Sequence, residues 1–140
     1  MLEIKENQAL NNRILVITHQ LSQTGAPIVL LDMVRILWRQ GYQIEVVTML
    51  DGELRHELSE MGIPVKVQER FLAQAEEFLQ YAGGFRLVVV NTLVAFEPVQ
   101  LLKYTNIPVL WWLHESERYF EHFQTVLPDF SRLPSNIYVF

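Results

Sequence analysis

The sequence of 140 residues contains no cysteine. Disulfide scaffolds, thiolate zinc sites, iron–sulfur clusters and thiol nucleophiles are therefore excluded, and nothing in the chain needs an oxidising compartment. Basic residues are also few, with 11 Lys and Arg against 16 Asp and Glu and a formal net charge of -5. Because a nucleic-acid backbone selects a basic surface, we expect no nucleic-acid partner.

Long apolar runs are absent as well. The longest, such as 87–90 and 108–113, are far shorter than the roughly 18 residues that cross a bilayer. Residues 1–12, which we interpret as a polar leader, lack the apolar core of a secretory signal. We therefore expect a cytoplasmic protein, with peripheral contact at the inner face of the membrane left open.

Half of the residues are hydrophobic, which is enough for one globular domain around a single core. Apolar runs typical of strands buried in a parallel sheet alternate with segments of helical spacing. The predicted strands are 13–19, 44–49, 64–67, 86–90, 108–113 and 136–140, and the predicted helices are 26–40, 53–61, 71–82, 97–104 and 118–125. This alternation predicts an α/β fold, a three-layer α/β/α Rossmann-like domain with a mostly parallel sheet.

The loop after the first predicted strand is the first candidate site, because ligands of open α/β sheets bind beyond the carboxyl ends of the strands. It places Thr24, Gly25 and Ala26 directly before a helix, where free backbone N–H groups and the helix dipole can hold an anion. The alternative is an ordinary helix start, with Thr24 as the cap and Pro27 in the first turn. The glycine fingerprints of dinucleotide-binding domains and P-loops are absent, which disfavours a nicotinamide cofactor.

Two further polar pairs follow strands at the same edge. His114 and Glu115 end the fifth strand, where a histidine can donate a hydrogen bond to a sugar hydroxyl or phosphate, or transfer a proton near neutral pH. Alternatively the histidine only packs at the strand end, and the glutamate is the first acid of a helix. Asn91 and Thr92 follow the fourth strand and either bind a ligand or cap the turn.

The remaining tryptophan, histidine and serine residues favour structural roles. Trp111 and Trp112 point to opposite faces of a strand, which indicates packing under helices rather than a platform for sugar rings. No histidine and carboxylate have the spacing of metal ligands, so we expect no metal, and no serine stands in a G-x-S-x-G elbow. His56 and His122 lie in charged helical segments and are predicted to be on the surface.

Five segments taken in order carry a further signal: ILVITHQLSQTGAP at 14–27, DGEL at 51–54, GIPV at 62–65, VNT at 90–92 and WWLHE at 111–115. Together they resemble the N-terminal half of family 4 glycosyltransferases with the GT-B fold. The most specific part is the Thr-Gly-Ala-Pro turn combined with a His-Glu after a tryptophan pair. The resemblance covers nearly the whole chain.

The resemblance implies a retaining transfer of a sugar from a nucleotide-sugar donor to a glycan, glycolipid or protein-linked acceptor, in polysaccharide biosynthesis, without a cofactor or metal. In that family two Rossmann-like domains face each other across a cleft, and the N-terminal one mainly receives the acceptor. The loop matching Thr24, Gly25 and Ala26 approaches the donor diphosphate. The histidine matching His114 lies near the transferred sugar and assists the reaction by hydrogen bonding, which makes His114 the catalytic candidate. The residues carried over as substrate-binding or pocket lining are His19, Asn91, Thr92 and Glu115.

The family's donor-binding domain, with its paired glutamates, would follow the sixth strand, where this sequence ends. We therefore expect residues 1–140 to form a single N-terminal domain, completed by a C-terminal donor-binding domain in cis or by a split partner, and inactive alone. The alternative is a stand-alone binding or regulatory module of the flavodoxin or receiver type. A receiver is disfavoured because the first strand ends in Thr18 and His19, without an acidic pair.

Overall fold

A computed structural model describes residues 11–115, 121, 125, 127 and 129–140. The predicted leader, apart from its last two residues, lies outside the described residues. So does most of the helix expected over 118–125, including His122.

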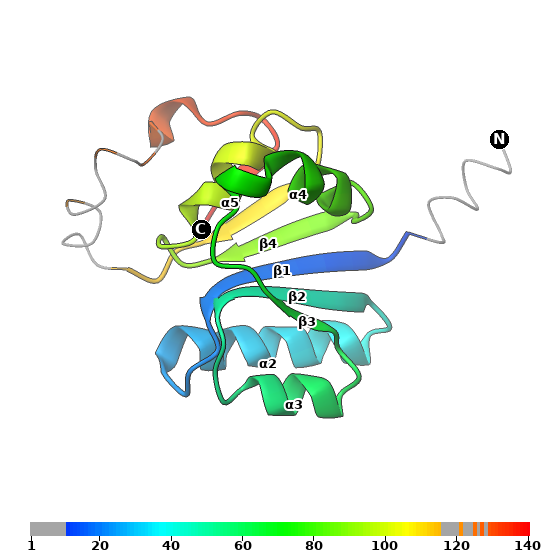
Figure 1. The fold of residues 1–140 in the computed structure, drawn as a ribbon. Coiled ribbons are helices and arrows are strands. Elements are labelled where there is room, and N and C mark those ends of the chain that lie inside the picture. Colours follow the sequence, from blue (N-terminus) through cyan, green and yellow to red (C-terminus); the bar gives the residue numbers. More distant parts are fainter. Residues whose placement is uncertain (1–10, 116–120, 122–124, 126, 128) are drawn as a thin grey trace, which may run out of the picture.

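Six strands form one sheet in which every neighbouring pair is parallel (Figure 1). They are β1 (Arg13–Gln20), β2 (Gln43–Leu50), β3 (Val65–Val67), β4 (Leu87–Asn91), β5 (Val109–Trp112) and β6 (Ile137–Val139). Their spatial order is β3-β2-β1-β4-β5-β6. From β1 the strands are added in one direction, through β2 to β3, and from β4 they are added in the opposite direction, through β5 to β6. The topological switch point therefore lies between β1 and β4.

Helices cover both faces of the sheet (Figure 1). They are α2 (Gly25–Arg39) and α3 (Arg55–Glu60) on one face and α4 (Ala75–Ala82) and α5 (Phe96–Leu102) on the other, with the short 3-10 helices η1 (Leu72–Gln74) and η2 (Phe130–Arg132). The predicted α/β/α layering is confirmed, and the sheet is parallel throughout rather than mostly parallel.

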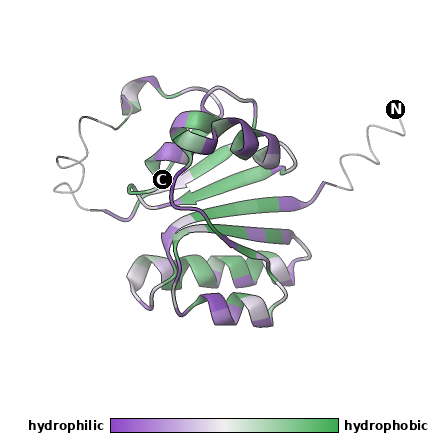
Figure 2. Cartoon of the chain, viewed as in Figure 1, coloured by the Kyte–Doolittle hydropathy of each residue, from purple (hydrophilic) through white to green (hydrophobic). Residues whose placement is uncertain are grey.

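The core consists of two apolar clusters, one on each face of the sheet. Along β1, Leu15 and Ile17 pack into the cluster under α4 and α5, whereas Ile14 and Val16 pack into the cluster against α2 and α3. Because both faces of the strand are covered, its sequence is apolar without alternation. Figure 2 shows the resulting hydrophobic sheet between the two layers of helices, of which α3 is largely hydrophilic.

Most predicted elements are confirmed with bounds that differ by two residues at most. The exception is the single helix expected over 71–82, which is wrong: the segment divides into η1 and α4 at Gln74 (φ -125°, ψ 39°). Phe71 lies outside α4, is completely buried, and meets Phe78 edge-to-face with 5.0 Å between ring centroids. Its N–H donates to Glu97 Oε2 at 3.1 Å, a tertiary contact that holds Phe71 in place before α4 begins.

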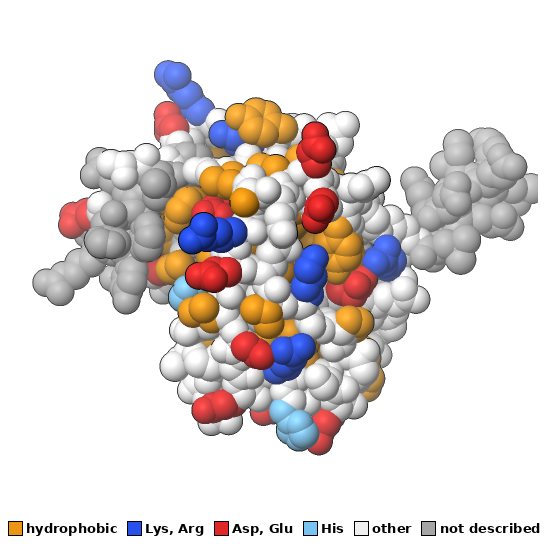
Figure 3. All heavy atoms as spheres, viewed as in Figure 1, with side chains coloured by type: hydrophobic (Ala, Val, Ile, Leu, Met, Phe, Trp, Pro, Cys, Tyr) orange, Lys and Arg blue, Asp and Glu red, His pale blue; other side chains and the backbone are white. Residues whose placement is uncertain are grey.

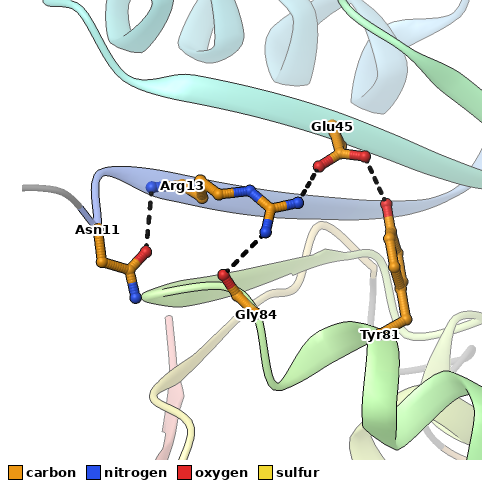
Figure 4. A network of polar contacts seen from close by, with 5 residues as sticks. All are labelled: Asn11, Arg13, Glu45, Tyr81 and Gly84. Atoms are coloured by element: carbon orange, nitrogen blue, oxygen red, sulfur yellow. Dashed lines mark hydrogen bonds and ion pairs between the residues drawn. The ribbon is translucent and has the colours of Figure 1, made fainter. Parts of the chain in front are cut away.

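A polar network joins α4 to the amino-terminal ends of β1 and β2 (Figure 4). The Arg13 guanidinium lies 2.5 Å from Glu45 Oε2, donates to Gly84 O at 3.2 Å and stacks over the Phe85 ring. Tyr81 donates its hydroxyl proton to Glu45 Oε1 at 3.0 Å, and burial, together with the negative charge of Glu45, raises the pKa of this phenol. The network therefore fixes the edge of the sheet opposite the carboxyl ends of the strands.

Candidate functional site

The carboxyl ends of β1, β4 and β5 surround a hollow of about 550 Å3 beside the switch point. It is lined by Thr18, His19, Gln20, Thr24, Ala26, Pro27, Thr92, Val94, His114 and Glu115. All the predicted site residues line this hollow except Gly25, which begins α2, and Asn91, which is fully buried and bonded to His114 behind the lining. The structure therefore brings the separately predicted residues to one place.

The start of α2 forms one wall of the hollow. Thr24 occupies the N-cap position with extended backbone (φ -118°, ψ 174°), but its side chain makes no cap hydrogen bond. Its hydroxyl lies 2.9 Å from Ser22 Oγ instead. The predicted alternative of a Thr24 cap is therefore right about the position of the residue and wrong about its side chain, which does not cap the helix. The first turn of α2 carries no acidic residue, and a Cβ built on Gly25 would meet no atom within 4 Å. The first N–H groups of the helix thus remain open to an anionic group.

Asn91 connects three parts of the site through its side-chain amide. Its Nδ2 lies 3.5 Å from Thr18 Oγ1 and 3.4 Å from Ala26 O, and its Oδ1 lies 2.7 Å from His114 Nε2. These contacts join β1, the first turn of α2 and the loop after β5. The predicted alternative of a turn cap does not describe this side chain, because its contacts reach other elements.

Glu115 fastens the loop after β5 to the loop after β4. Its Oε1 accepts from the Leu93 N–H at 2.7 Å, and its Oε2 accepts from the His114 N–H at 2.9 Å. Charge-assisted bonds of this length are strong and directional. The carboxylate therefore fixes the backbone that carries His114.

Thr92 has an unfavourable backbone conformation at the wall of the hollow. Its φ of 75° is the only positive value at a non-glycine residue in the described part of the chain. Two bonds hold it there, from its own N–H to Trp112 O at 2.8 Å and from Trp111 Nε1 to its carbonyl oxygen at 3.0 Å. Its Oγ1 is buried without a hydrogen-bond partner among the described residues. A strained residue with an unused buried hydroxyl is typical of a ligand-binding position.

His19, near the end of β1, lines the same hollow and is partly buried. Burial lowers the pKa of its imidazole below 6.5, and the negative charge of Glu115 offsets part of this decrease. Near neutral pH the ring is therefore uncharged, so it offers one hydrogen-bond donor and one acceptor.

The two tryptophans take packing roles, as predicted for this pair. Trp111 is fully buried and stacks on Phe130 with 5.6 Å between ring centroids. Trp112 packs against the other cluster, stacks on Phe140 at 5.5 Å, and lies 4.8 Å from the His114 ring. Trp112 therefore also supports one side of the candidate histidine.

The remaining histidine of the described residues lies on the surface outside the hollow. His56 is exposed, as predicted, with Nε2 3.1 Å from Glu60 Oε1. Among the described residues no three His, Asp or Glu side chains gather in a way that could hold a metal ion. None of the helices within the described ranges is long and apolar enough to cross a membrane. Acidic and basic side chains are interspersed on the face shown in Figure 3.

Sequence reasoning missed four contributors to the hollow, Thr18, Gln20, Pro27 and Val94. Thr18 could have been found, because it is a polar residue at the end of an otherwise apolar strand.

Gly52 has a structural role beside the hollow. A Cβ at this position would lie 2.3 Å from the backbone of Leu21, so only glycine lets the loop after β2 pack against the loop after β1.

Comparisons with known proteins identify the family and the fold of the chain. A family model described as glycosyl-transferase family 4 matches residues 10–136. Two crystal structures of Anabaena HepE are similar: the complex with UDP and glucose (25% identity, TM-score 0.61, 76% of this chain and 32% of that one) and the complex with UDP-glucose (22%, 0.69, 89% and 36%). A glycosyltransferase from Rickettsia africae gives 13% identity and a TM-score of 0.57, covering 91% of this chain and 42% of that one.

No curated protein gives a match. The chain spans about a third of the length of the HepE structures. The predicted fold class, a Rossmann-like half of a GT-B fold, is confirmed by the parallel sheet and by these neighbours. Because the family model matches nearly the whole chain, the protein belongs to glycosyltransferase family 4.

Proposed function

We propose that the chain is the acceptor-side, N-terminal domain of a retaining glycosyltransferase. The enzyme would move a sugar from a nucleotide-sugar donor to a glycan, glycolipid or protein-linked acceptor, in polysaccharide biosynthesis. The observation that carries the proposal is the convergence of His114, Asn91 and the uncapped start of α2 on one hollow at the switch point. The complexes of HepE with UDP-glucose and with UDP and glucose support a nucleotide-sugar as the donor.

In this proposal the open N–H groups around Thr24, Gly25 and Ala26 meet the diphosphate of the donor. Negative charge develops on this group as the glycosidic bond breaks, and backbone dipoles that are already oriented stabilise it without reorganisation. His114 hydrogen-bonds the transferred sugar, while His19, Thr92 and Glu115 line the pocket. The reaction needs no metal and no cofactor.

The proposal includes a second domain that binds the donor nucleotide, supplied in cis or by a split partner. The hollow of this chain would form one wall of the cleft between the two domains. We expect the chain alone to give no turnover. We also place the enzyme in the cytoplasm, with peripheral contact at the inner face of the membrane when the acceptor is lipid-linked.

The test uses the natural protein that contains this chain, together with its partner if the donor domain is separate. Release of nucleoside diphosphate from a panel of nucleotide-sugars identifies the donor, and His114→Ala should then lower kcat/KM by roughly 100-fold or more. His56→Ala, an exposed histidine outside the hollow, is the matched control and should transfer normally. Full transfer activity in His114→Ala would remove the assigned role. Flavin absorbance in the purified protein would instead favour a flavodoxin-like module.

A further inference from the structure

We propose that Asn91 is a positioning residue that holds His114 in the tautomer protonated at Nε2, leaving Nδ1 as the free hydrogen-bond acceptor of the ring. The tautomer is argued from contacts within this chain. Its importance for sugar transfer rests on the proposed function.

The direction of each hydrogen bond around Asn91 is fixed by the two neighbours that accept from it, Ala26 O and Thr18 Oγ1. Ala26 O is a carbonyl oxygen 3.4 Å from one end of the Asn91 amide, so that end must be the donating Nδ2. Thr18 Oγ1 donates its own proton to Gln20 O at 3.3 Å and is therefore an acceptor for the same Nδ2. Both neighbours thus assign the amide in the same orientation.

The opposite end of the amide is consequently Oδ1, which lies 2.7 Å from His114 Nε2. An amide oxygen cannot donate, so Nε2 must carry a proton in this contact. A neutral imidazole has one N–H, which leaves Nδ1 unprotonated. No described residue provides a hydrogen-bond partner for Nδ1, and His114 lines the hollow. A ligand hydroxyl can therefore donate to this nitrogen.

The described groups around His114 hold its ring in place, and the hydrogen-bond partner of the ring among them is the neutral amide of Asn91. Trp112 packs beside the ring at 4.8 Å, and both oxygens of Glu115 are engaged by backbone N–H groups. His19, across the hollow, has a pKa lowered by burial and is neutral near pH 7. Among the described residues that line the hollow, His19 and Glu115 are the titratable groups besides His114. Asn91 therefore restrains the ring as a neutral partner, where an aspartate would favour the imidazolium.

Nitrogen NMR of the chain tests the tautomer directly, without a substrate. With 15N-labelled histidine above neutral pH, the His114 ring should show a protonated Nε2 and an unprotonated, pyridine-like Nδ1. In Asn91→Ala both shifts should move toward the average of two exchanging tautomers. In Asn91→Asp the imidazolium should persist to a pH higher by about one unit or more, because a carboxylate then accepts the Nε2 proton.

Asn106→Asp is the matched control, since it makes the same charge change at an exposed position outside the hollow. It should leave the His114 signals unchanged. All spectra are recorded below the unfolding transition of each variant, and the wild-type spectrum tests the assignment even if a variant does not fold. A wild-type ring protonated at Nδ1, or ring shifts that do not respond to either Asn91 change in folded protein, would overturn the proposal.

Kinetics of the natural protein separate this inference from the proposed function. Activity that needs neutral His114 rises with pH as the ring loses its proton, so Asn91→Asp should shift that rise to higher pH by about one unit. An unmoved pH profile would overturn the positioning role in transfer. If instead the predicted tautomer is present and the natural protein transfers sugar from none of the nucleotide-sugars in the panel, the proposed function fails and the tautomer assignment stands.

Discussion

At the scale of single residues, Thr92 is held at the wall of the hollow in a conformation that lowers the stability of the folded chain. Thr92 combines a left-handed backbone with a buried hydroxyl that no described residue satisfies. Neither property follows from the sequence, because a threonine after a strand is compatible with many turns. The contacts that impose the conformation come from the backbone and ring of the tryptophan pair on β5.

Replacing Thr92 by valine should stabilise the unliganded chain by about 1 kcal/mol, because it removes a buried polar group without a partner and keeps the shape. The same change should weaken donor or acceptor binding by the natural protein. Urea denaturation measures the first effect and titration calorimetry the second.

Thr105→Val is the matched control. The Thr105 hydroxyl donates to Leu102 O at 2.7 Å and accepts from the Ile107 N–H at 3.2 Å, so its loss should cost about 1 kcal/mol. Equal destabilisation by both substitutions would show that the Thr92 hydroxyl has a structural partner and is not reserved for a ligand.

At the scale of helices and strands, the sequence predicted an element well where the apolar residues of one segment show a single pattern, either helical spacing or a continuous apolar run. It failed at 71–82, where the helical spacing is continuous but the helix is not. The interruption depends on Glu97, which lies 26 positions along the chain from Phe71 and accepts its N–H. A contact this distant does not appear in the periodicity of the sequence, whereas a local signal marks the end of α2: Gly41, just after the helix, has a φ of 94°, a conformation that favours glycine.

The segment before α4 should therefore behave as an anchor in the core rather than as a helical turn. Phe71→Ala should lower the free energy of unfolding by about 3 kcal/mol or more, because the ring is fully buried. Leu72→Ala, next in sequence but 52% exposed, should change it by less than about 0.5 kcal/mol. Chemical denaturation of both variants makes the comparison. Similar values for the two would contradict the assignment of Phe71 to the core.

At the scale of the whole molecule, the sequence predicted the layer architecture and the gathering of the candidate residues at one edge of the sheet, because parallel strands present their carboxyl ends together. It did not predict that Asn91 and His114 are bonded. That contact needs β4 and β5 to be neighbours, a strand order that the apolar pattern leaves open. The site residues were found through the motifs, and their mutual geometry only through the fold.

The stability of the whole chain should fall as the pH decreases below about 6.5, and His19 should contribute to the fall. Its pKa is lowered in the folded state, so between 6.5 and the folded value the unfolded chain binds the additional proton. The contribution of this group is therefore present above pH 6.5 and is lost as the pH falls through the folded pKa.

Urea midpoints measured from pH 8 to pH 5 should decrease less in His19→Gln than in the wild type. His56→Gln, at an exposed histidine, should retain the wild-type slope. A wild-type slope in His19→Gln would contradict the burial effect on this imidazole.

The network of Arg13, Glu45 and Tyr81 lies at the amino-terminal edge, and the hollow lies at the carboxyl edge, so the length of the strands separates the two. Changes at one edge need not propagate to the other, because a parallel sheet buried on both faces stands between them. Substitutions can therefore accumulate in the loops of the hollow while the opposite edge keeps the domain folded. Because of the same separation, stabilising substitutions can be made at the amino-terminal edge without changing the residues that line the hollow.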